Sequence, residues 1–172
     1  DHGAQYFTAR SEAFAKQVDA WRSGGVAAAW SGRFATLDND GLRGDKGERY
    51  VGTPGMNAIV RATLDGLDVR FGEQVDAITR QDRAWTVETD NGSSIGQFDE
   101  LVVAVPAPQA GILLAEVAPA FADIATRARM SPCWAAMLAF PVRVDLPFDG
   151  AKVRDQGPIG WMARNSSKPG RP

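Results

Sequence analysis

Residues 98–108, FDELVVAVPAP, decide how the rest of the chain is interpreted. Residues 101–105 are apolar without interruption, a pattern typical of a strand that is covered on both faces in an α/β layer. Pro106 and Pro108 end the run, because proline cannot donate to a strand ladder and holds the preceding residue extended. Ligands bind at the carboxyl ends of strands in open α/β sheets. We therefore expect one wall of a ligand crevice where this run ends.

The residues before this run predict a β-meander that leads into it. Residues 75–79 are predicted to be a strand, apolar and polar residues alternate over 85–89, and Asp90-Asn91-Gly92 is a strong hairpin signal. Residues 95–98 then pair back toward the central run. A further short strand is predicted at 69–71.

The first part of the chain predicts helices separated by a region of mixed character. Ser11 is a suitable N-cap for a helix that ends at Gly24-Gly25. Residues 26–37 fit a helix or a strand equally well. Residues 42–48 are predicted to be a polar loop and 49–52 a short strand. A second helix is expected to begin at Thr53-Pro54-Gly55.

The last part of the chain predicts two short helices and a second sheet. The helices are expected at 110–117 and 121–129, broken at Pro119. Residues 133–140 are apolar and predict a strand, with residues 159–163 as its partner.

Composition describes an ordinary globular protein with few special features. The chain has 172 residues, a net charge of −2 and no dense basic cluster, which argues against a nucleic-acid binder. No apolar run is long enough to span a bilayer, and there is no signal-peptide pattern. Cys133 is the only cysteine, so no disulfide framework is expected and a cytoplasmic setting is the default. One histidine makes a metal site improbable.

Few motifs carry chemistry by themselves. No G-x-G-x-x-G or Walker pattern occurs, and no carboxylate pair is placed together by the sequence. Cys133 with His2 is a conceivable nucleophile and base, but a cysteine within an apolar run is more often a small core residue. His2 keeps a possible ligand-side role through the neighbouring Gly3. The polar residues 164–167 form either a solvated strand end or a pocket rim.

Aromatic side chains are a second possible source of a binding site. Most aromatic residues belong to cores, so each is more often structural than ligand-binding. The candidates for an aromatic pocket are Tyr6, Phe7, Tyr50, Trp134 and Trp161.

Four stretches together resemble the renalase-like branch of the flavin-containing amine oxidase superfamily. They are DHGAQYF at 1–7, YVGTPGM at 50–56, the strand with Val75 that leads to VAVP at 103–106, and WMARNSSKP at 161–169. The likeness covers essentially the whole chain. It implies a mixed α/β (α+β) fold: the central part of a FAD/NAD(P)-binding Rossmann-like domain, interleaved with an antiparallel-sheet substrate domain.

The resemblance also implies a division of the chain and a set of site residues. Residues 1–7 and 51–109 would belong to the FAD-binding domain, and residues 8–50 and 110–172 to the substrate-binding domain. The cofactor-binding residues would be Gly3, Ala4, Gln5, Val75, Ala104, Val105 and Pro106. Trp161 and Asn165 would lie on the substrate side.

Family members open with a Gly-rich turn that holds the FAD pyrophosphate at a helix N-terminus, and they close with another segment near the flavin. Neither is found here, so the chain is expected to be the middle of a longer enzyme.

The expected function is that of an FAD-dependent oxidoreductase. It would oxidise a small amine or a reduced nicotinamide-type substrate by hydride transfer to flavin. Two alternatives stay open: another flavoenzyme of related fold, such as a desaturase or monooxygenase, and a non-catalytic binding module.

Overall fold

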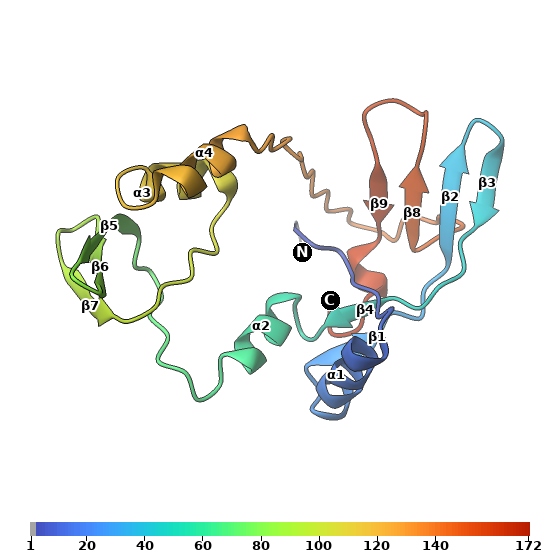
Figure 1. Cartoon of the computed structure of the whole chain (residues 1–172). Coiled ribbons are helices and arrows are strands. Elements are labelled where there is room, and N and C mark those ends of the chain that lie inside the picture. Colours follow the sequence, from blue (N-terminus) through green and yellow to red (C-terminus); the bar gives the residue numbers. More distant parts are fainter. Residues whose placement is uncertain (1–2) are drawn as a thin grey trace. The chain divides into compact units, whose positions relative to one another are not determined.

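The computed structural model describes residues 3–172 and has the mixed α/β composition predicted from the sequence. Asp1 and His2 lie outside the described residues, and so does the suggested ligand-side role of His2. The chain divides into two compact units, one of Asp1–Leu67 and Ala135–Pro172 and the other of Asp68–Trp134 (Figure 1). This division follows packing, and the assignment of segments to FAD and substrate domains stays a prediction.

The first helix of the first unit, α1 (Glu12–Ser23), begins and ends where the sequence predicts. The side chain of Ser11 accepts a hydrogen bond from the backbone N–H of Phe14 at 3.3 Å, which satisfies a donor that the first turn leaves free. Gly24 caps the other end. Val18 is buried on the inner face, and Trp21 and Phe14 meet edge to face at 5.9 Å between ring centroids.

The ambiguous region after α1 forms strands. β1 (Ala27–Ala29) pairs antiparallel with β4 (Tyr50–Gly52), and Phe7 forms an isolated bridge with Tyr50. The N-terminal segment is therefore held against β4. The predicted helix after Thr53 is present as α2 (Asn57–Thr63).

A four-stranded sheet in the order β3-β2-β8-β9 carries the remaining elements of the first unit (Figure 1). Its strands are β2 (Phe34–Asp38), β3 (Gly41–Gly44), β8 (Gly150–Val153) and β9 (Trp161–Ala163). β2 and β8 run parallel, and the other neighbours run antiparallel. Ala35, Phe148 and Ala151 form the buried cluster on this sheet, with Leu146 and Met162 packed against it.

The prediction of a polar loop over 42–48 is wrong for its first residues. Gly41 has a φ of +104°, which lets the chain turn back beside β2. The strand that Gly41 begins, β3, is at the edge of the sheet. One side of an edge strand needs no hydrogen-bond partner, and its polar side chains face solvent. Charged residues therefore do not exclude a strand here.

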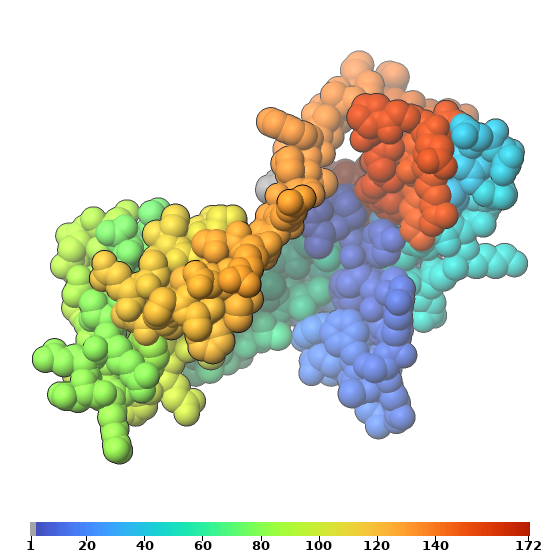
Figure 2. All heavy atoms as spheres, turned by 45° about the horizontal axis from the view of Figure 1, so that its top comes forward, coloured from blue at the N-terminus to red at the C-terminus, as the bar shows by residue number. Residues whose placement is uncertain are grey.

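The prediction of a strand at 133–140 is wrong. These residues are extended coil with no ladder partner, and Trp134 is 95% exposed. β9, the predicted partner, pairs with β8 instead. In Figure 2 the orange residues of this segment appear as a single thickness of chain. An apolar run becomes a strand only where a neighbouring strand offers hydrogen bonds, and no described residues do so here.

The second unit contains the predicted β-meander, formed by β5 (Val75–Gln81), β6 (Ala84–Thr89) and β7 (Ser94–Phe98). The predicted turn joins β6 to β7: Gly92 has a φ of +79°, and the side chain of Asn91 accepts hydrogen bonds from Thr89 and Ser93. Residues 69–71, predicted as a strand, are coil.

Two helices follow the meander, α3 (Ala107–Leu114) and α4 (Pro119–Arg127), each shifted two or three residues from its predicted start. Both have a proline in the first turn, where its missing N–H costs no helical hydrogen bond. In the second unit the buried apolar residues are Ile78 of β5, Val87 of β6 and Ala122 of α4.

The central buried strand predicted at 101–105 is not formed. These residues are coil between β7 and α3, and Val102 and Val105 are 87% and 42% exposed. Within the described residues, β7 is the end of the meander and no strand lies beside 101–105. The local preference for an extended backbone is retained, but the layer that would cover it is not present.

A pair of glycines in the four-stranded sheet gives a direct test of its packing. A Cβ at Gly150 would lie 2.9 Å from the Trp161 ring and 3.2 Å from Phe34, whereas one at Gly44 would meet nothing within 4 Å. We expect Gly150→Ala to lower the free energy of unfolding by about 1–3 kcal/mol through overpacking. Gly44→Ala should change it by less than about 0.5 kcal/mol. Urea unfolding followed by circular dichroism measures both, and equal effects would contradict this packing.

Candidate active site

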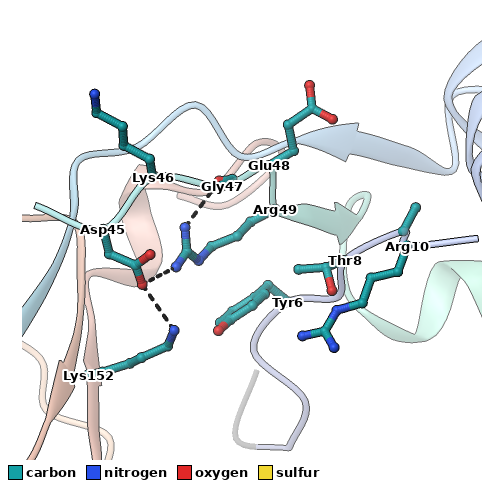
Figure 3. Close-up of a pocket in the computed structure, with 10 residues that line it drawn as sticks. Tyr6, Thr8, Arg10, Asp45, Lys46, Gly47, Glu48, Arg49 and Lys152 are labelled. Atoms are coloured by element: carbon teal, nitrogen blue, oxygen red, sulfur yellow. Dashed lines mark hydrogen bonds and ion pairs between the residues drawn. The ribbon is translucent and has the colours of Figure 1, made fainter.

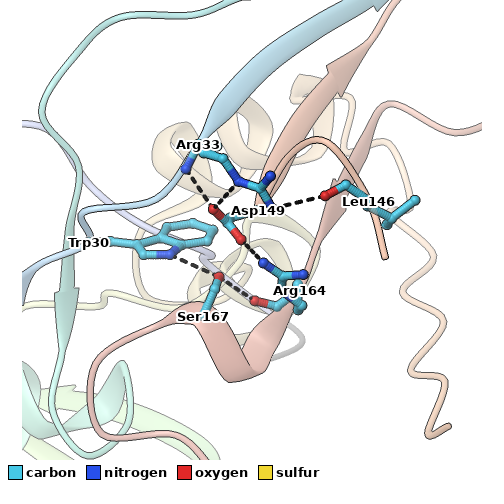
Figure 4. Close-up of polar contacts among 6 residues, drawn as sticks. All are labelled: Trp30, Arg33, Leu146, Asp149, Arg164 and Ser167. Carbon is cyan, nitrogen blue, oxygen red and sulfur yellow. Dashed lines mark hydrogen bonds and ion pairs between the residues drawn. The ribbon is translucent and has the colours of Figure 1, made fainter. Parts of the chain in front are cut away.

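The carboxylate of Asp149, directly before β8, joins two arginines from distant parts of the first unit. It accepts hydrogen bonds from the backbone N–H of Arg33 at 2.7 Å and from its Nε at 3.3 Å, and it pairs with Nη2 of Arg164 (Figure 4). Arg33 also donates to the carbonyl of Leu146 at 2.9 Å. Asp149 is buried, so both of its oxygens need these partners.

Opposing effects act on the pKa of Asp149. Burial alone would raise it, but the hydrogen bonds from the backbone and side chain of Arg33 and the charges of Arg164 and Arg33 together hold the pKa below its usual value. The carboxylate is therefore charged at neutral pH. It fixes Arg164 at the end of β9, where the next segment begins.

The residues after Arg164 form a single 3₁₀ turn, η1 (Asn165–Ser167), which is hydrogen-bonded to Trp30. The indole N–H of Trp30 donates to the hydroxyl of Ser167 at 3.1 Å, and this hydroxyl donates to the carbonyl of Arg164 at 2.7 Å (Figure 4). The backbone N–H of Lys168 closes the turn on the carbonyl of Asn165 at 3.0 Å. The position of Lys168 is thereby set by Trp30 and Asp149.

Lys168 is a buried amine, with only 2% of the residue exposed. Its Nζ donates to the side-chain carbonyl of Gln5 at 2.9 Å and lies 5.3 Å from the centroid of the Trp30 ring. Burial, and to a lesser degree the charge of Arg171, lower the pKa of Lys168 from 10.5 to about 8. A lysine with such a pKa exchanges its proton readily near neutral pH, which is a common property of functional sites.

Aromatic rings surround the N-terminal segment next to this amine. The ring of Tyr6 lies 5.3 Å from Trp161 and 6.4 Å from Trp30 between centroids. The indole nitrogen of Trp161 is buried and has no hydrogen-bond partner among the described residues. A buried N–H without a partner is uncommon in folded proteins, so this indole nitrogen is an unused hydrogen-bond donor of the aromatic group.

In the first unit the structure brings several of the predicted site residues together. Gly3 and Ala4 are exposed, and Gln5, half-buried, contacts Lys168. Trp161 is the first residue of β9, and Asn165 opens η1. Of the aromatic candidates, Tyr6 and Trp161 are in this site, whereas Phe7 and Tyr50 pack with each other beside α1. Trp134 and Cys133 are exposed.

The other predicted cofactor residues belong to the second unit. Val75 begins β5 and pairs with Thr89. Ala104, Val105 and Pro106 are exposed, and Pro106 is the N-cap of α3. α3 contacts β5, so these residues lie in neighbouring elements of that unit. Their role toward the cofactor stays a prediction.

Sequence reasoning missed Lys168 and Asp149. Lys168 directly follows residues 164–167, which the sequence predicts to be a solvated strand end or a pocket rim, and nothing in its spacing signals a buried amine. Asp149 stands in a Pro- and Gly-containing excursion where carboxylates are usually solvated. Only the return of β8 beside β2 gives it two arginine partners.

The model of the flavin containing amine oxidoreductase family matches residues 3–167, and the chain belongs to this family. Its cofactor is accordingly FAD. The donor types present fit a flavin ring, whose edge is rich in nitrogen and oxygen acceptors, because the side-chain amide of Gln5 and the indole N–H of Trp161 can each donate a hydrogen bond. Within residues 3–172 no cluster of His, Cys, Asp or Glu suits a metal, and none of the described helices is long and apolar enough to cross a membrane.

Removing the charge of Asp149 should destabilise the chain and reduce its acid sensitivity. Asp149→Asn leaves Arg164 buried without its counter-ion, which costs about 3–5 kcal/mol. Asp19→Asn is the matched control, since its pair with Arg22 is exposed and worth less than about 1 kcal/mol.

The pH dependence of that variant follows from the lowered pKa. The stabilisation from Asp149 is complete above its unfolded value of 3.8 and is lost as pH falls through the lower folded value. The difference in unfolding free energy between wild type and Asp149→Asn, measured in urea from pH 6 to pH 2.5, should therefore shrink below pH 4. A constant difference would refute the assigned role.

Lys168 gives a second pH-dependent prediction, in the alkaline range. With a folded pKa of about 8 and an ordinary value of 10.5, the unfolded chain binds more protons between these values, so Lys168 makes stability rise with pH across this window. Lys168→Met should remove that rise. Urea midpoints of the two proteins from pH 7 to pH 10.5 measure it, and ¹³C-lysine NMR should show one ε-methylene titrating near pH 8 that the variant lacks.

Proposed function

We propose that this chain is part of a renalase-like FAD-dependent oxidoreductase, which oxidises a small amine or a reduced nicotinamide-type substrate. The observation that carries the proposal is the buried amine of Lys168, bonded to Gln5, in a member of the flavin containing amine oxidoreductase family. Bound FAD would supply the hydride acceptor.

In this proposal the residues of the first unit hold the flavin ring and the substrate. Gly3 and Ala4 have no bulky side chains and allow close approach of a planar ring, and Gln5 presents its amide there. Trp161 and Asn165 contact the substrate. From the second unit, Val75 and 104–106 border the cofactor.

Lys168 is proposed to manage the proton of an amine substrate. A protonated amine has no lone pair with which to assist loss of a hydride from its neighbouring carbon, so the substrate must first give up a proton. Nζ of Lys168, neutral in part near pH 8, accepts that proton from the substrate nitrogen and becomes an ammonium. A reduced nicotinamide needs no such step, which separates the two substrate classes.

The surroundings of Lys168 support this role. Trp30 lies over the amine and binds η1 through Ser167, so the lysine has little freedom to turn into solvent. Tyr6 packs against both Trp30 and Trp161, so the ring next to the amine belongs to a larger aromatic group. The pyrophosphate of FAD is assigned, in this proposal, to residues outside the 172, since the chain has no G-x-G-x-x-G.

Anaerobic reduction of the flavin tests the proposal in a polypeptide that contains this chain and its bound FAD. Benzylamine and NADH serve as the two substrate probes, and bleaching of the flavin absorbance is followed by stopped flow. Bleaching by either probe supports the proposed activity and identifies its class. A protein without flavin, or one whose flavin neither probe reduces, would contradict it.

The same assay tests the role of Lys168. If an amine is the substrate, Lys168→Met should slow flavin reduction about 100-fold or more and remove the pH dependence near pH 8. Lys16→Met is the matched control, because Lys16 pairs with Glu12 on the exposed face of α1. Equal rates in both variants would show that Lys168 takes no part in the proton transfer.

A further inference from the structure

A cleft of about 440 Å³ opens in the first unit between the N-terminal segment and the chain before β4 (Figure 3). This volume is in the range of small-molecule sites. Of the aromatic residues Tyr6, Trp30 and Trp161 described above, only Tyr6 also lines the cleft. It is lined by Tyr6, Thr8, Ala9, Arg10, Asp45, Lys46, Gly47, Glu48, Arg49 and Lys152.

The lining carries an excess of positive charge. Four cationic side chains face two carboxylates. Asp45 is the only carboxylate that pairs with lining cations in the described structure, accepting from Arg49 at 2.6 Å and from Lys152 at 3.0 Å. One anion therefore serves two cations. The other carboxylate, of Glu48, accepts from the hydroxyl of Tyr50 instead.

Asp45 stays charged within this arrangement. Burial would raise its pKa, but the hydrogen bond from Lys152 and the charges of Arg49 and Lys152 hold the pKa below the usual value. Asp45, Arg49 and Lys152 together thus carry a net positive charge at neutral pH.

Arg49 forms the rigid floor of the cleft. It is only 4% exposed, and its guanidinium carbon lies 4.0 Å from the centroid of the Phe34 ring and 5.0 Å from that of Tyr6. Nη1 donates to the carbonyl of Gly47 at 3.1 Å, while Nε is buried without a partner among the described residues. A guanidinium fixed between two aromatic rings contributes a positive charge to the lining, and such a charge attracts an oxyanion.

The N-terminal segment supplies one of these four cations, Arg10. Gln5 and Phe7 face Lys168 and Tyr50, and Tyr6, Thr8 and Arg10 line the cleft. Figure 3 shows the guanidinium of Arg10 near Thr8, while the carboxylate of Glu48 points away from Tyr6.

We infer that this cleft binds the oxyanion group, phosphate or carboxylate, of a small molecule, with Arg10 and Lys152 as mobile ligands and Arg49 as the fixed floor. The hydroxyl of Thr8 and the ring of Tyr6 complete the lining. The lining of the cleft does not include Lys168, and the inference does not depend on the proposed oxidation.

Titration of the 172-residue chain with inorganic phosphate and with acetate, followed by ¹H–¹⁵N NMR, tests the inference. We expect saturable shifts confined to residues near 6–10, 45–49 and 152. Tighter binding of phosphate than of acetate indicates a phosphorylated ligand, and the reverse order a carboxylate. Shifts scattered over the surface, or none up to 50 mM, would overturn the proposal.

Charge-matched variants separate a site from general attraction to a basic surface. Arg10→Gln and Lys152→Gln should each weaken binding of the preferred anion about tenfold, the usual loss for one charge-assisted hydrogen bond. Lys16→Gln removes the same charge on exposed α1 and should change the dissociation constant less than twofold. Equal effects of all three would refute the site. Arg10 is exposed, so its variant keeps the fold, which circular dichroism verifies.

Discussion

The pairing of Asp149 with Arg33 and Arg164 is the interaction on which the first unit depends. One buried carboxylate joins the start of β2, the start of β8 and the end of β9. Buried ion pairs add little net stability, because desolvation offsets much of their attraction, but a partner left alone is costly. The contact therefore acts mainly by fixing register. Through Arg164 it places η1, and η1 places Lys168 against Gln5.

The N-terminal segment contributes side chains to two places in the first unit. Gln5 bonds to Lys168, and Phe7 packs in the aromatic cluster beside α1. Thr8 and Arg10 line the cleft with Arg49. A bridge between Phe7 and Tyr50 is the only strand pairing the segment makes within the described residues. That single bridge determines which side chains face each site.

Sequence reasoning succeeded where structure is set by neighbouring residues. The cap of α1 at Ser11, the turn at Asn91-Gly92 and the meander depend on contacts a few residues apart, and each was predicted. It failed at 101–105 and 133–140, where composition favours a strand but no partner is present. The lysine site was found only in part, since burial of Lys168 depends on Trp30, 138 residues earlier in the chain.

The parallel pairing of β2 with β8 has a consequence for the timing of folding. Arg33 and Asp149 are 116 residues apart in the chain, with the whole second unit between them. A ribosome adds about 5–20 residues per second, so roughly 6–23 s pass between synthesis of the two. During this interval the β2–β3 hairpin has no parallel neighbour, and Arg33 has no counter-ion from Asp149. The meander of the second unit, whose contacts are local, can assemble while the first unit is still waiting for its last strands.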